Sequence, residues 1–122
     1  MAPSYHVLIA DDDAGIRAVL AHIVQQTYPD ATVSVVADGL AALHIYNQQG
    51  ADLVLTNYMM PRLSGLNLIR ALRTRNLTVP IIMVSGEVTQ ASAALAAGAT
   101  YFLAKPFTRA QLVQLIISVL PP

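Results

Sequence analysis

The chain has no cysteine and few charged residues, and both shortages exclude classes of protein. Without cysteine it can form neither a disulfide framework nor a thiolate metal site. Its seven basic and seven acidic residues cancel, so we expect neither nucleic acid nor an anionic membrane as a partner. Hydrophobic residues make up 55% of the sequence, yet no apolar run reaches the roughly 18 residues that span a bilayer. The N-terminal segment lacks the basic start and cleavage site of a signal peptide, so we expect a cytoplasmic location.

Short apolar runs alternate with segments of helical periodicity along the whole chain, which is the pattern of β–α–β units. Most of these runs are almost continuously apolar, as strands covered on both faces are. Five runs in strict alternation with five helices predict an α/β fold, a doubly wound parallel sheet with helices on both faces. A length of 122 residues predicts a single domain over 1–122. The expected strands are 5–10, 32–36, 52–56, 81–84 and 100–104.

The helices between these strands have recognisable ends and faces. Asp13 and Asp38 are expected to cap the first two helices, and Thr108 the last, which runs to about residue 119. Short oxygen-bearing side chains do this by accepting hydrogen bonds from the free N–H groups of a first turn. Gly98 is expected to end the alanine-rich fourth helix in a left-handed conformation. The apolar face of the first helix is expected to hold Ile16, Val19, Leu20 and Ile23, spaced i, i+3, i+4 and i+7.

Polar side chains with phosphate or metal chemistry follow four of the expected strands. Ligands of an open parallel sheet bind beyond the carboxyl ends of its strands, so these side chains are expected to lie together. Taken singly, each has an ordinary interpretation as a helix cap, a turn or a surface residue. Their joint placement favours a shared site. The side chains are Asp11, Asp12 and Asp13 after the first strand, Asn57 after the third, Ser85 after the fourth and Lys105 after the fifth.

Four segments resemble the receiver domain of response regulators in two-component signalling, and together they cover essentially the whole chain. The resemblance implies a flavodoxin-like (βα)5 fold with strand order 2-1-3-4-5. It also implies a phosphorelay signalling module, not an enzyme. The segments are ADDDAGIR at 10–17, TNYMMPRLSG at 56–65, VSGE at 84–87 and FLAKPF at 102–107.

The resemblance implies a magnesium site beside the phosphoacceptor. Asp11 and Asp12 match the acidic pair that holds Mg²⁺, and Met59 would supply a backbone carbonyl as a further ligand. Asn57 falls at the phosphoacceptor position, where its amide oxygen is a possible fourth ligand. Because an amide carries no charge, the metal affinity is expected to fall without vanishing, which gives a weak Mg²⁺ site.

The resemblance also implies how a phosphoryl group would be bound and sensed. Ser85 matches the hydroxyl that bonds the phosphoryl group, and Lys105 matches the lysine that neutralises its charge. Phe102 falls at the aromatic switch position and is expected to turn inward when Ser85 moves. Gly86 is expected to let the backbone pass close to the site, and the bond before Pro106 is a candidate cis peptide.

Asn57 is the departure from the family pattern. An uncharged carboxamide is not the nucleophile that an ionised carboxylate is, so phosphoryl transfer to this position is not expected. Two explanations stay open. The chain is either a natural degenerate receiver that works as a phosphorylation-independent protein-interaction module, or an ordinary receiver with an Asp→Asn change. The second is slightly favoured because Asp11, Asp12, Ser85 and Lys105 are all intact.

Partners follow from the resemblance and from the last helix. The resemblance implies a histidine kinase or phosphotransfer protein upstream, and an output domain or partner protein on the face of the fourth helix, strand 100–104 and the last helix. A helix that is apolar almost all round is normally buried on more than one side, which predicts a homodimer. The alternative is an apolar patch without a partner. The apolar residues are Leu112, Val113, Leu115, Ile116, Ile117, Val119 and Leu120.

Two other families share features with this sequence. Asp11 and Asp13 after a strand give the acidic pair of a haloacid-dehalogenase-like phosphatase, but Gly15 departs from its motif and the chain is too short for the later motifs and a cap. A flavodoxin-like carrier shares the architecture, but three aspartates after the first strand would repel its phosphate. Both are weaker interpretations than the receiver.

Overall fold

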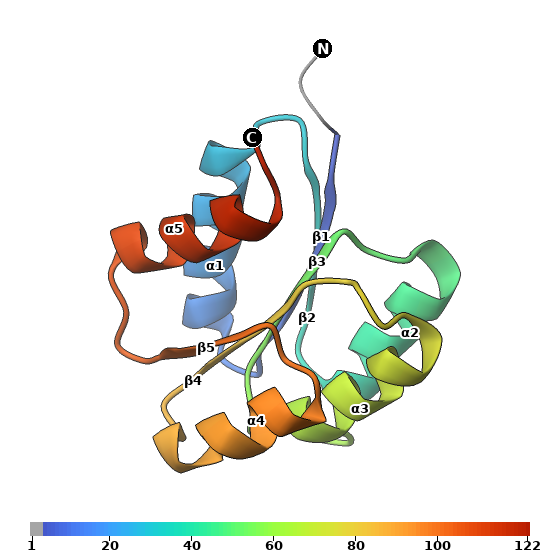
Figure 1. Cartoon of the computed structure of the whole chain (residues 1–122). Helices are drawn as coiled ribbons and strands as arrows, with labels where there is room; N and C mark the ends of the chain where they lie inside the picture. Colours follow the sequence, from blue (N-terminus) through green and yellow to red (C-terminus); the bar gives the residue numbers. More distant parts are fainter. Residues whose placement is uncertain (1–3) are drawn as a thin grey trace.

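Five parallel strands form one sheet in the order β2-β1-β3-β4-β5, with helices on both faces (Figure 1). This computed structural model describes residues 4–122. The doubly wound fold and the strand order are therefore confirmed, and each strand lies within one residue of its expected bounds. The strands are β1 (His6–Ala10), β2 (Thr32–Val36), β3 (Leu53–Thr56), β4 (Ile81–Ser85) and β5 (Tyr101–Ala104). The helices are α1 (Ala14–Thr27), α2 (Gly39–Gln49), α3 (Gly65–Arg75), α4 (Ala91–Ala97) and α5 (Arg109–Val119), with a short 3-10 helix η1 (Val88–Gln90) before α4.

The helix ends follow the expected chemistry. Asp13 accepts a hydrogen bond from a first-turn N–H of α1 at 3.1 Å, and Asp38 accepts one from α2 at 2.8 Å. Thr108 and Gln111 form a reciprocal capping box at the start of α5. Gly98 ends α4 with a φ of 119°, which is left-handed backbone that favours glycine. All four predicted caps are confirmed.

The sheet separates two apolar cores because successive side chains of a strand point to opposite faces. Helices α1 and α5 cover one face of the sheet, and α2, α3 and α4 cover the other (Figure 1). In β1, Val7 and Ile9 belong to the core under α1 and α5, and Leu8 and Ala10 to the core under α2, α3 and α4. The central strands β1, β3 and β4 are buried almost throughout, as expected for strands covered on both faces. The edge strands β2 and β5 are partly exposed.

The buried face of α1 differs by one residue from the expected one. Val19 was expected on the apolar face but is 47% exposed, whereas Val24 is fully buried. The helix turns about 100° per residue. The buried residues Leu20, Ile23 and Val24 are centred close to Leu20, so Val24 lies about 40° from the centre of the buried face and Val19 about 100° from it.

Most of the apolar surface of α5 is covered by the chain itself. Leu112, Ile116 and Leu120 are buried, and three further apolar residues pack partly buried against the same core. Ile117 is 38% exposed. The burial that the sequence required of this helix is thus largely met without a second subunit, and the homodimer stays a prediction. Among residues 4–122, no helix has both the length and the hydrophobicity to span a membrane.

Candidate functional site

Backbone hydrogen bonds of the sheet continue one residue past the strands and hold the polar side chains at its carboxyl edge. The Asp11 N–H donates to the last residue of β2 at 3.1 Å, and the Asn57 N–H donates to the last residue of β1 at 2.9 Å. The Lys105 N–H donates to the last residue of β4 at 3.0 Å, and the Lys105–Pro106 peptide bond is cis. The main chain therefore fixes where these three side chains start.

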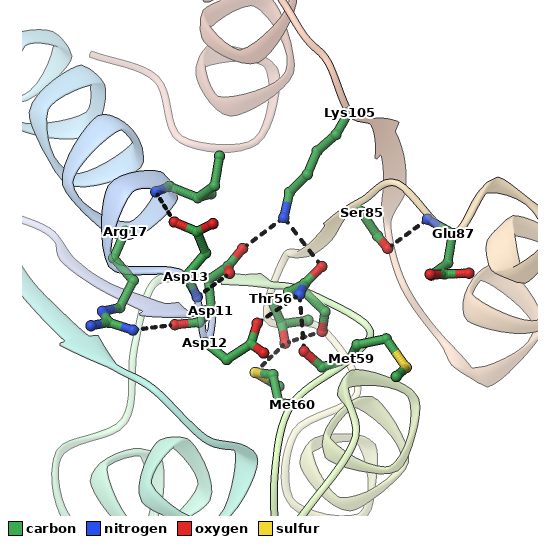
Figure 2. Close-up of polar contacts among 12 residues, drawn as sticks. Asp11, Asp12, Asp13, Arg17, Thr56, Met59, Met60, Ser85, Glu87 and Lys105 are labelled. Atoms are coloured by element: carbon green, nitrogen blue, oxygen red, sulfur yellow. Dashed lines mark hydrogen bonds and ion pairs between the residues drawn. The ribbon is translucent and has the colours of Figure 1, made fainter.

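Lys105 joins two of the neighbouring strand ends. Its Nζ donates to Asp11 Oδ2 at 2.9 Å (Figure 2) and to Asn57 Oδ1 at 3.3 Å. Asp11 is fully buried, and its other carboxylate oxygen accepts the Asp13 N–H at 2.9 Å. A buried carboxylate is tolerated only when it is paired and hydrogen-bonded, and here both conditions hold. Arg17 also contacts this residue, because its Nη1 donates to the Asp11 carbonyl oxygen at 2.7 Å.

The Asn57 carboxamide lies between Lys105 on one side and two oxygens on the other. Its Nδ2 donates to the Met59 carbonyl oxygen at 3.0 Å and to Asp12 Oδ1 at 3.3 Å. The orientation of the amide is fixed by its neighbours, since an ammonium group can only donate and the two oxygens can only accept. Turning the amide over would place donors against donors on one side and acceptors against acceptors on the other.

The oxygens around Asn57 are of the kind that Mg²⁺ binds. Asp12 Oδ1 and the Met59 carbonyl oxygen lie within hydrogen-bonding distance of the same nitrogen, so they converge on one point, and Lys105 links Asp11 to the same amide. Magnesium is bound by one or two carboxylates with other oxygens and retained water. Within residues 4–122, no group of three or more His, Cys, Asp or Glu side chains could hold a metal ion. A cation here would therefore need main-chain oxygen and water besides Asp11 and Asp12.

Ser85 lies at the end of β4, where its carbonyl oxygen accepts the Lys105 N–H, and Phe102 lies within β5. Ser85 is fully buried at the end of β4, and its Oγ accepts the Glu87 N–H at 3.0 Å, so the hydroxyl oxygen faces its own loop (Figure 2). Phe102 is partly buried and packs against the core under α2, α3 and α4. The structure thus brings five of the predicted site residues into direct contact: Asp11, Asp12, Asn57, Met59 and Lys105.

A glycine shapes the site, but it is Gly65 and not Gly86. A Cβ on Gly65 would lie 1.9 Å from the Asn57 carbonyl oxygen, so only glycine fits there. A Cβ on Gly86 would meet nothing within 4 Å, so the expected close passage of the backbone at Gly86 is not found. The sequence motif contained Gly65, but the contact arises from the turn between β3 and α3. Arg17 was also missed as a site residue, although it ends the segment ADDDAGIR and lies one helical turn from Asp13.

Comparisons with known proteins agree with this geometry. The family described as "Response regulator receiver domain" matches residues 7–117. The alkaline phosphatase synthesis transcriptional regulatory protein SphR of Synechococcus elongatus is 35% identical over 123 residues, which cover 92% of this chain and 47% of that protein. The sensory transduction protein RegX3 of Mycobacterium tuberculosis is 35% identical over 116 residues, which cover 93% of this chain and 50% of that protein. The chain spans about half the length of these curated relatives.

Solved structures give the same result. The chemotaxis response regulator CheY4 of Vibrio cholerae superposes with a TM-score of 0.87 at 29% identity, covering 97% of this chain and all of that one. NtrX from Brucella abortus superposes with a TM-score of 0.87 at 26% identity, covering 97% of this chain and 27% of that one. A family match over nearly the whole sequence, the shared strand order and the polar cluster at the carboxyl edge of the sheet all agree. The chain belongs to the response regulator receiver domain family, the signalling modules of two-component systems.

Proposed function

We propose that this receiver domain, a single module over residues 1–122, signals without accepting a phosphoryl group. The observation that carries the proposal is the group presented at the end of β3, where the Asn57 carboxamide lies between Lys105 and Asp12. A receiver needs a carboxylate there as its nucleophile, and an amide oxygen is a poor one. The remaining groups keep the chemistry of a phosphoryl-binding pocket, which supports assigning Asn57 to the acceptor position.

The other pocket residues keep their proposed roles. Asp11, Asp12 and the Met59 carbonyl are the ligands of a weak Mg²⁺ site, which would neutralise charge on a phosphoryl group when bound. Lys105 supplies a second positive charge, and Ser85 the hydroxyl that bonds the phosphoryl oxygens. Phe102 is the switch residue. In this chain the Ser85 hydroxyl accepts a hydrogen bond from the Glu87 N–H of its own loop. This contact supports a resting state in which Ser85 has not moved toward the phosphoryl site.

Intact mass after incubation with acetyl phosphate and Mg²⁺ tests the proposal, on the unaltered chain and on the Asn57→Asp variant. We expect only the variant to gain one phosphoryl mass, because its carboxylate restores the nucleophile. A double variant, Asn57→Asp with Lys105→Ala, controls for labelling elsewhere and is expected to gain little. If the unaltered chain is labelled, the proposal is wrong. If none is labelled, the pocket has lost its phosphoryl chemistry beyond Asn57, which indicates a protein-interaction module alone.

The proposed partner surface is the face of α4, β5 and α5, and the proposed homodimer would form there. Val88, Leu95 and Tyr101 are exposed apolar residues on or next to α4 and β5, with exposed fractions of 56%, 50% and 37%. Sedimentation velocity over a concentration series tests this pairing. We expect the mean mass to rise with concentration, and Leu95→Ser to abolish the rise. The control Leu40→Ser changes a leucine of α2 that is 47% exposed, and it should behave like the unaltered chain. A monomer at every concentration would contradict the homodimer.

A further inference from the structure

The amide nitrogen of Asn57 lies at the point on which two metal-ligand oxygens converge. It is 3.0 Å from the Met59 carbonyl oxygen and 3.3 Å from Asp12 Oδ1. On the other side of the same side chain, the amide oxygen accepts from Lys105, which also binds Asp11. These contacts form one continuous chain of donors and acceptors from β1 through β5 and β3 to the loop after β3 (Figure 2).

We propose that the Asn57 carboxamide takes the place of the divalent cation and closes the pocket as an internal clamp. An NH₂ group carries partial positive charge on two hydrogens, so it can satisfy two oxygens that a cation would otherwise draw together. Asn57 is only 9% exposed, so a largely buried amide that lost these two acceptors would lose most of its hydrogen bonding. The clamp holds the Met59 carbonyl, and with it the loop between β3 and α3, without metal.

A cation and the clamp exclude one another. To reach both oxygens, Mg²⁺ has to displace the NH₂ group. Turning the amide over would present its oxygen to the metal, but it would then direct the NH₂ group at the Lys105 ammonium, where donor meets donor. The amide oxygen of Asn57 is therefore held as the acceptor of Lys105 and is not available as a ligand. Asn57 thus weakens metal binding in two ways: it lacks the negative charge of an aspartate, and its NH₂ group competes with the cation for the same oxygens.

The Asn57→Ala variant separates this inference from the usual expectation. If the amide oxygen were a ligand, alanine would weaken Mg²⁺ binding. If the amide is a clamp, alanine removes the competing donors and frees both oxygens. In Asn57→Ala, Mg²⁺ no longer has to break the hydrogen bonds of the Asn57 NH₂ group, whose net strength is about that of one hydrogen bond. We therefore expect Asn57→Ala to bind Mg²⁺ roughly threefold to tenfold more tightly than the unaltered chain.

Titration of the ¹⁵N-labelled chain with MgCl₂, followed by amide chemical shifts of residues 10–13 and 57–60, measures the affinity of each variant. Asn57→Asp is the positive control and is expected to bind most tightly. Tighter binding by Asn57→Ala than by the unaltered chain supports the clamp. If Asn57→Asp binds Mg²⁺, equal or weaker binding by Asn57→Ala than by the unaltered chain overturns the clamp.

The inference rests on the proposed magnesium role, so a second readout tests the clamp by itself. We expect the Asn57 side-chain NH₂ protons to exchange with water at least about tenfold more slowly than those of the exposed Asn47, because two acceptors and burial protect them. Asp12→Ala should speed this exchange, and Asp30→Ala, a change far along the chain, should not. If no variant binds Mg²⁺ but the protons are protected, the magnesium role fails and the clamp stands. If Asn57 exchanges as fast as Asn47, the clamp is wrong.

Discussion

Replacing Tyr28 by phenylalanine removes one hydroxyl that ties the end of α1 to the end of α5. Tyr28 is 3% exposed, and its hydroxyl lies 2.6 Å from the Leu120 carbonyl oxygen and 3.1 Å from that of Ile116. The Ile116 carbonyl keeps a second donor, the Leu120 N–H at 2.8 Å, whereas the Leu120 carbonyl loses the hydroxyl. We expect Tyr28→Phe to lower the free energy of unfolding by about 1.5 kcal/mol at neutral pH, because a polar group at a buried contact loses its partner.

The same hydroxyl makes this difference depend on pH. Burial, and secondarily the charge of the neighbouring Tyr5, raises the pKa of Tyr28 to about 12 from an ordinary 10.0. Between these values the unfolded chain releases the proton and the folded chain keeps it. The folded state then binds more protons, so its stability falls as pH rises. The contribution is fully present below pH 10 and is lost by about pH 12. Ionisation of Tyr28 over this range lowers the stability of the folded state by roughly 3 kcal/mol, and about half of that loss has occurred by pH 11.

Urea unfolding followed by far-ultraviolet circular dichroism at pH 7, 9 and 11 measures the effect. The difference in unfolding free energy between the unaltered chain and Tyr28→Phe should be about 1.5 kcal/mol at the two lower pH values and close to zero at pH 11. Other groups that titrate contribute to both proteins and cancel. Tyr101→Phe, at an exposed position, is the control and should differ from the unaltered chain by less than about 0.5 kcal/mol. A difference at pH 11 as large as at pH 7 would refute the reasoning.

Two further predictions concern the site. Lys105→Met leaves the fully buried Asp11 without its ammonium partner, and we expect the unfolding free energy in urea to fall by about 3 kcal/mol; a fall below about 0.5 kcal/mol would mean that the pair contributes little. Gly65→Ala forces a Cβ onto the Asn57 carbonyl oxygen, so we expect a loss of more than about 2 kcal/mol and amide shifts throughout the loop between β3 and α3. Gly86→Ala is the matched control, because a Cβ there meets nothing within 4 Å, and a loss as large as that of Gly65→Ala would contradict the steric argument.

The sequence by itself determined the elements, their order and the residues at the sheet edge. Apolar runs of strand length alternating with helical periodicity are local patterns, and each predicted strand was found within one residue of its bounds. The caps at Asp13, Asp38 and Thr108 were predictable for the same reason, since a cap bonds to residues two or three positions along the chain. Parallel strands with their carboxyl ends at one edge then bring Asp11, Asn57 and Lys105 together.

Only the tertiary structure decided which atoms of those residues face one another. The Asn57 amide directs its oxygen to Lys105 and its nitrogen to Asp12, and this follows from the path of the loop after β3, which no periodicity encodes. The same holds for Gly65, which is required by a contact between segments eight residues apart, and for the burial of α5, whose apolar residues are covered mostly by its own chain. Local patterns fix local structure because they act through neighbouring backbone. Contacts across the fold depend on how loops and helices pack. This packing places the Asn57 amide between Lys105 and Asp12.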